Sequence, residues 1–154
     1  MYKLVILLFL FGCQNSISEV KPLIINYDEV QIDVVEKELF INTDIPKKMN
    51  IMLNNWFNDK VKVNGFQGKV LFEINQYQEI ISNIENGKKI DVKLDIKIHI
   101  DSKDQLSSQK NFQIKLNEFG TITGNFSLSE VDTMIENLQK NIVNNLSKTI
   151  NSRI

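Results

Sequence analysis

The sequence predicts an α+β domain, a two-layer sandwich in which a four-stranded, mainly antiparallel sheet is covered on one face by two helices. Two observations carry this prediction: an unbroken alternation of apolar and polar residues over residues 90–101, and a long apolar stripe at helical spacing over residues 128–150. Shorter patterns before and between them add three strands and a first helix. The expected order of elements is β-α-β-β-β-α.

The stretch from Ile90 to Asp101 has the period of a strand with one dry face and one wet face. Full burial of six aliphatic side chains, at about 1.5–3 kcal/mol each, stabilises the fold by roughly 10 kcal/mol before the entropy of folding is subtracted. The dry face therefore needs an apolar cover. The six side chains are Ile90, Val92, Leu94, Ile96, Ile98 and Ile100.

Three further strands are predicted over residues 29–40, 70–76 and 112–117. Asn86-Gly87, a strong hairpin signal, leads into the strand that begins at Ile90. Beyond Gln76 the alternation changes phase. A β-bulge, or a strand that leaves the sheet, would account for this change. The residues beyond it are expected to form a bent part of the core strand, with an apolar lip at a binding surface as the alternative. The lip would consist of Tyr77, Ile80, Ile81 and Ile84.

The first helix is expected to have Asp44 as its N-cap and Pro46 in its first turn, and to end near Lys60. Its apolar stripe consists of Ile45, Met49, Met52, Leu53 and Trp56. Trp56 is interpreted as the large plug of a helix-on-sheet core, with a ligand platform or a partner anchor as the alternative. Phe57 lies off the stripe and is expected to be exposed.

The second helix begins with a capping box, Ser127 with Glu130. Its stripe predicts about 24 residues, or roughly 36 Å, which matches the roughly 40 Å of a strand of about 12 residues. This helix is therefore expected to lie along the sheet as its main cover. A coiled coil is the alternative for a stripe of this spacing.

The first residues have the pattern of a short secretory signal, with Lys3 followed by an apolar run from Leu4 to Phe11. That run is too short to cross a bilayer, which needs about 20 residues. Leu10-Phe11-Gly12-Cys13 resembles the bacterial lipobox. The alternatives are an ordinary signal with an incidental cysteine and a buried first strand.

The lipobox resemblance implies a signal peptide of residues 1–12, cleavage between Gly12 and Cys13, and acyl chains on Cys13 that hold the protein to a membrane. Cys13 is the only cysteine, so an intramolecular disulfide cannot explain it. Residues 13–28 would be a lipidated tether and 29–154 a single domain. Gln14, rather than an aspartate, after the cysteine implies the periplasmic face of the outer membrane.

The sequence contains few residues that indicate catalysis, metal binding or nucleic-acid binding. The net charge is −1, so there is no basic excess to hold nucleic acid. His99 is the only histidine and has no second ligand for a metal. Asp91 and Asp95 share a strand face, but lysines lie between them and no pocket to raise a catalytic pKa is indicated. We therefore expect that the chain is not an enzyme and that it uses no cofactor.

The order of elements over residues 30–152 is similar to that of two groups of small Gram-negative envelope lipoproteins. These are the lipopolysaccharide-assembly lipoprotein and the auxiliary lipoproteins of ABC-type lipid transporters, the latter with a Trp in the first helix, here Trp56. Uncharacterised alphaproteobacterial lipoproteins have a similar order. The resemblance implies an accessory of outer-membrane assembly or lipid transport that docks on a larger envelope protein. The alternative is a periplasmic carrier that holds a lipid or other apolar ligand in a helix-sheet cleft around Trp56, Phe72 and Tyr77.

Overall fold

The computed structural model describes residues 27–102 and 109–154. The strands are β1 Val30–Ile32, β2 Glu36–Ile41, β3 Val61–Val63, β4 Lys69–Ile84, β5 Gly87–Asp101 and β6 Lys110–Thr123. The helices are α1 Lys47–Lys60 and α2 Leu128–Asn151.

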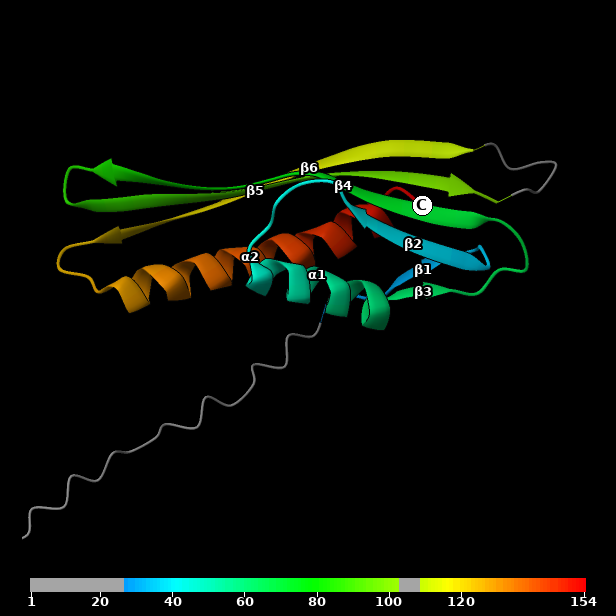
Figure 1. The fold of residues 1–154 in the computed structure, drawn as a ribbon, viewed down its shortest axis with the longest axis horizontal. Helices are drawn as coiled ribbons and strands as arrows, with labels where there is room; N and C mark the ends of the chain where they lie inside the picture. Colours follow the sequence, from blue (N-terminus) through cyan, green and yellow to red (C-terminus); the bar gives the residue numbers. More distant parts are fainter. Residues whose placement is uncertain (1–26, 103–108) are drawn as a thin grey trace, which may run out of the picture.

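The main sheet has the strand order β2-β4-β5-β6, in which β2 is parallel to β4 and the other pairs are antiparallel. Both helices lie on one side of it (Figure 1). The predicted α+β sandwich is therefore confirmed, with the predicted order of elements kept by β2, α1, β4, β5, β6 and α2. The sheet side that carries the helices is called the inner face, and the other side the outer face.

The predicted first strand over residues 29–40 is in fact two strands in two sheets. β1 pairs with β3 in a separate two-stranded parallel sheet, and β2 joins the main sheet. Between them the Val34 amide donates to the Ile32 carbonyl at 2.9 Å, which makes a tight turn. Val34 is fully buried and Val35 is exposed, so the consecutive valines mark the turn and not a continuous strand.

The first helix begins later than predicted. Its N-cap is Pro46, no side chain caps it, and helical residues start at Lys47. The assignment of Asp44 as the N-cap is thus wrong, and Pro46 lies just before the first turn. A proline disfavours helical geometry in the residue before it, which keeps Ile45 and Asp44 outside the helix.

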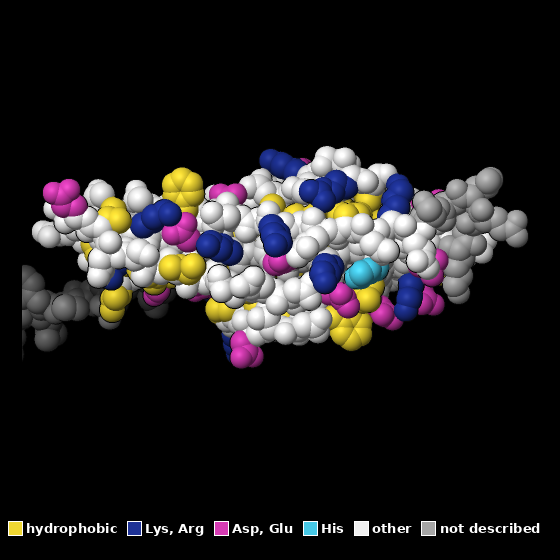
Figure 2. All heavy atoms as spheres, turned by 90° about the horizontal axis from the view of Figure 1, so that it is seen from above, with side chains coloured by type: hydrophobic (Ala, Val, Ile, Leu, Met, Phe, Trp, Pro, Cys, Tyr) yellow, Lys and Arg dark blue, Asp and Glu magenta, His cyan; other side chains and the backbone are white. Residues whose placement is uncertain are grey.

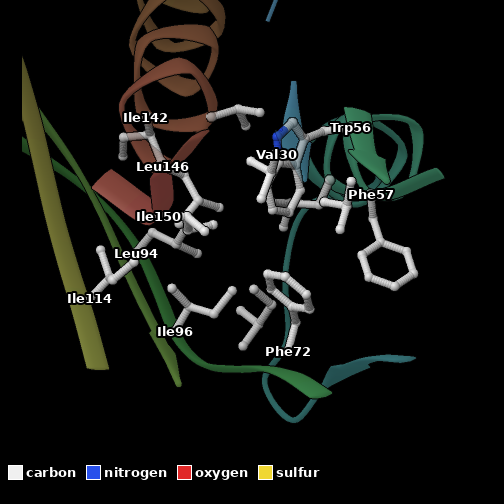
Figure 3. Close-up of a cluster of buried hydrophobic side chains, with 14 of the residues drawn as sticks. Val30, Trp56, Phe57, Phe72, Leu94, Ile96, Ile114, Ile142, Leu146 and Ile150 are labelled. Carbon is white, nitrogen blue, oxygen red and sulfur yellow. The ribbon is translucent and has the colours of Figure 1, made fainter. Parts of the chain in front are cut away.

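The core lies between the helices and the sheet (Figure 3). Trp56 and Phe72 are fully buried and meet edge to face, with ring centroids 5.9 Å apart. Phe57 also packs edge to face on Phe72, at 5.6 Å, so the expectation that Phe57 is exposed is wrong. These rings form one aromatic cluster between α1 and β4.

Lys37 explains how Phe57 is covered. Its Nζ lies 4.8 Å from the centroid of the Phe57 ring and donates to the Phe57 carbonyl at 2.8 Å and the Val61 carbonyl at 2.6 Å. A cation at a helix C-terminus satisfies carbonyls that have no partner inside the helix and complements the helix dipole. Burial, with Lys62 nearby, lowers the pKa of Lys37.

The second helix has the predicted start and length. Ser127 accepts from the Glu130 amide, and the Glu130 carboxylate accepts from the Ser127 amide at 2.6 Å, which completes the capping box. The helix has 24 residues and buries one side against β5 and β6. These contacts show that its apolar stripe belongs to the core of this chain.

Candidate functional site at the hairpin end of the sheet

A β-bulge in β4 changes which residues face the helices. The pairing of β4 with β5 shifts between Ile74 and Gln76, so Ile74 lies opposite Ile96 and Tyr77 lies opposite Leu94. Two residues that lie directly opposite each other in an antiparallel pair have their side chains on the same side of the sheet. Even-numbered residues therefore point inward before the bulge and odd-numbered residues after it, which confirms the bulge interpretation of the phase change.

Beyond the bulge, β4 is an edge strand. β2 pairs with β4 as far as Ile41 opposite Ile74, and the last backbone bond runs from the Asn42 amide to the Ile74 carbonyl at 2.9 Å. Figure 1 shows the chain leaving the sheet there for α1. In the described part of the chain, no strand pairs with residues 76–84 on their other side. These residues are called the open edge.

Three isoleucines of the open edge are exposed, which corrects the expectation that this part of β4 lies in the core. The exposed fractions are 39% for Ile80, 47% for Ile81 and 39% for Ile84. Ile81 is on the inner face, opposite Ile90, whereas Ile80 is on the outer face, opposite Asp91. The apolar lip therefore presents side chains on both faces of the sheet.

The inner side of the open edge is fixed to α2 by a polar network. Gln139 Nε2 donates to the Tyr77 hydroxyl at 2.9 Å and to Glu79 Oε1 at 2.8 Å, and the Tyr77 hydroxyl donates to the same carboxylate oxygen. Burial, and then the bond to Glu79, raise the pKa of Tyr77. Gln139 was not singled out from the sequence, although it falls on the buried side of the α2 stripe. A polar side chain at such a position usually has a hydrogen-bond partner.

On the outer face, Phe119 completes the hairpin end. It lies opposite Asp91, which in turn lies opposite Ile80, so the three side chains form a row across β4, β5 and β6. Lys89 Nζ binds Asp91 Oδ1 at 2.9 Å and lies 5.2 Å from the centroid of the Phe119 ring. Phe119 remains 63% exposed. The predicted strand ended at residue 117, whereas β6 continues to Thr123. The odd position of Phe119 in the β6 alternation is the signal that its side chain points outward.

The rest of the outer face carries mostly polar side chains, and no described element covers it. Figure 2 views it directly and shows lysines spread along it, with hydrophobic side chains between them. His99 Nε2 lies 3.3 Å from Glu73 Oε2, and its Nδ1 lies 2.9 Å from Asn111 Oδ1. Within residues 27–102 and 109–154, no group of three or more metal-ligating side chains occurs.

The residues proposed for a helix-sheet cleft do not form one open site. Trp56 and Phe72 are packed in the core, and Tyr77 belongs to the network with Gln139. The groove that does border Trp56 lies along α1 and has a volume of about 340 Å³. Tyr27 also lines this groove, and burial raises the pKa of Tyr27 to about 12.

Gly12 and Cys13, with the signal peptide and most of the tether, lie outside the described residues. None of the helices that the structure describes is both long enough and apolar enough to pass through a lipid bilayer.

Comparisons with known proteins give no family. No family model matches the chain, and no curated protein matches it. Solved structures with a similar arrangement include bacterial lipoproteins. A minor lipoprotein from Acinetobacter baumannii has 12% identity and a TM-score of 0.46, covering 79% of this chain and 92% of that one. The rare lipoprotein B from Shewanella oneidensis has 9% identity and a TM-score of 0.45, covering 77% and 92%. An uncharacterized lipoprotein B from Nitrosomonas europaea has 10% identity and a TM-score of 0.44, covering 77% and 86%. At these identities and scores, the likeness assigns no function to this chain.

Proposed function

We propose that this protein is a lipid-anchored, non-enzymatic accessory of outer-membrane assembly or lipid transport, which docks on a larger envelope protein through the outer face of its sheet. The observation that carries the proposal is the outer face, which no described element covers. Both helices lie on the other side. Phe40, which pairs with the outward-facing Glu73, is exposed on this side together with Ile80 and Phe119. Exposed aromatic and aliphatic side chains surrounded by polar residues are typical of protein interaction sites.

The position of Tyr27 supports this use of the outer face. Tyr27 is the first described residue, and it lies beside α1, in the helix layer. A membrane anchor on Cys13 would enter the domain from this side. The outer face would then be free to meet a partner in the periplasm.

One observation favours the alternative function, a periplasmic carrier. The groove along α1 has Met52 and Trp56 in its lining, and its volume of about 340 Å³ is at the lower end of the range for ligand pockets. An apolar ligand of this carrier would lie on the outside of α1, beside Trp56, and not between the helix and the sheet.

Native mass spectrometry of the protein, extracted from its own membranes in mild detergent, tests both functions. The docking accessory is expected to have a mature mass that starts at Cys13 with acyl chains, and to retain a bound envelope protein. A lipidated monomer with one additional non-covalent lipid would favour the carrier. An unmodified Cys13, judged against a Cys13→Ser control, would rule out the anchor.

A pair of matched variants tests the surface itself. Phe119→Ser removes a 63% exposed ring from the outer face, and Phe66→Ser removes a 96% exposed ring from the turn before β4. Loss of the complex with Phe119→Ser alone supports docking through the outer face. Retention of the complex with both variants, or loss with both, contradicts it.

A further inference from the structure

The open edge differs from the other edges of the main sheet in its lack of charge. β2 carries Glu36, Lys37 and Glu38, and β6 carries Lys110, Lys115 and Glu118. Charged side chains of this kind protect sheet edges from pairing with other chains. The single charged residue of the open edge, Glu79, is bonded to Tyr77 and Gln139 on the inner face. The open edge is therefore unprotected where its isoleucines are exposed.

The space beside the open edge is limited at both ends. At one end the chain leaves β2 at Asn42, whose amide is bonded to the Ile74 carbonyl. At the other end, β4 turns into β5 at Glu85 and Asn86. A strand of at most about nine residues, or roughly 30 Å, can be added between these limits.

We propose that a second copy of this chain occupies the open edge, with the two β4 strands antiparallel about a twofold axis perpendicular to the sheet. This symmetry places the outer faces of the two copies on the same side of the joined sheet. Side chains alternate between the two faces along a strand, so two residues that lie opposite each other across the contact must both be odd-numbered or both even-numbered. The twofold axis must therefore pass beside one residue of the open edge, which then lies opposite its own copy. Repulsion between like charges and steric overlap decide which residue this is.

Three of the four central registers are unfavourable. An axis at Glu79 sets that carboxylate against its own copy, and an axis at Ser82 sets Glu79 against Glu85, so both place like charges opposite each other. With an axis at Ile80, Asn42 of one copy would overlap the turn at Glu85 of the other. Asn42 lies at that position because it directly follows the residue that pairs with Ile74.

The register centred on Ile81 avoids both problems. It sets Ile81 against its own copy, Ile80 against Ser82, Glu79 against Asn83 and Gln78 against Ile84. No like charges face each other, and the start of the connection to α1 lies beyond the hairpin turn of the other copy. The isoleucine with the highest exposure in the open edge is thus buried at the centre of the contact, on the inner face.

Cysteine cross-linking tests the register. Cys13→Ser removes the only native cysteine, so a new cysteine reports one position. Facing residues of antiparallel strands have Cα atoms about 4.5–5.5 Å apart, which a disulfide can span. With this background, Ile81→Cys is expected to form a covalent dimer on mild oxidation, at least about tenfold faster than Ser82→Cys. Equal rates for the two variants, or no covalent dimer with Ile81→Cys, would overturn the register.

Analytical ultracentrifugation of the Cys13→Ser chain tests the dimer itself. Ile81→Lys places a charge at the axis and is expected to raise the dimer dissociation constant at least about tenfold. The matched control is Ile51→Lys on α1, because Ile51 has an exposed fraction of 51% against 47% for Ile81. A parent chain that stays monomeric at every concentration reached would overturn the proposal, as would equal effects of the two lysine variants. Both lysine variants replace exposed side chains, so circular dichroism is expected to show unchanged secondary structure.

Discussion

The hydrogen bond between Trp56 and Ser147 joins α1 to α2 inside the core, and its removal gives a sharp test of the packing. Trp56 Nε1 donates to Ser147 Oγ at 2.7 Å, and both side chains are almost fully buried. An indole N–H can only donate, so Ser147→Ala leaves a buried donor without an acceptor. That costs about 1–3 kcal/mol, of which the better helix propensity of alanine offsets about 0.5 kcal/mol.

The effect of Ser147→Ala should depend on Trp56. In a Trp56→Phe background the indole N–H is absent, and the serine hydroxyl can bond to a carbonyl of its own helix. Ser147→Ala is then expected to be close to neutral, so the coupling free energy between the two positions is about 0.5–2.5 kcal/mol.

Urea unfolding followed by far-ultraviolet circular dichroism measures the four free energies of unfolding. Fluorescence is unsuitable because Trp56 is the only tryptophan. A cost of Ser147→Ala below about 0.5 kcal/mol, or the same cost in both backgrounds, would refute the role of this bond.

Further predictions concern two glycines and one carboxylate. A Cβ at Gly87 would lie 1.8 Å from the Ile122 carbonyl oxygen, so Gly87→Ala should destabilise the protein by about 2–4 kcal/mol. Gly124 has a φ of +80° with no atom within 4 Å of such a Cβ, so Gly124→Ala should cost only about 1–2 kcal/mol. Thermal unfolding measures the stability of both variants, and equal losses of stability would contradict the close approach at Gly87. Bonds to Lys140, and then to Lys48, lower the pKa of Glu136 from 4.5 to about 2. Because the pKa is lower in the folded state, this stabilisation is complete above pH 4.5 and is lost as the pH falls towards 2; Glu136→Gln should flatten that part of the stability profile, and an unchanged profile would argue against the ion pairs.

The hairpin between β4 and β5 shows what a local signal can and cannot predict. Asn86-Gly87 correctly predicts the turn, because this dipeptide favours tight hairpins. The structural need for glycine has a different origin, however. Gly87 is already paired in β5, opposite Thr123, and the neighbouring β6 carbonyl at Ile122 leaves no room for a side chain. That close approach involves a strand more than thirty residues away and leaves no trace in the local sequence.

The open edge gives a second example. The phase change after Gln76 predicts the bulge, because the alternation of side chains follows directly from strand geometry. Whether Ile80, Ile81 and Ile84 are buried depends on where β2 stops beside β4 and on where α1 lies. These are long-range facts, so the sequence left a bent core strand and an apolar lip open as alternatives, and the structure shows the lip.

The sequence alone determined the class of the fold, the central strand, and the start and length of the long helix. Each of these follows from side-chain periodicity or from capping between residues three or four positions apart. Only the tertiary structure decided that residues 29–40 are divided between two sheets, that Lys37 covers Phe57, and that no described strand pairs with the second edge of residues 76–84. The physical reason is that burial and strand pairing depend on neighbours that are distant in sequence, which local patterns cannot encode.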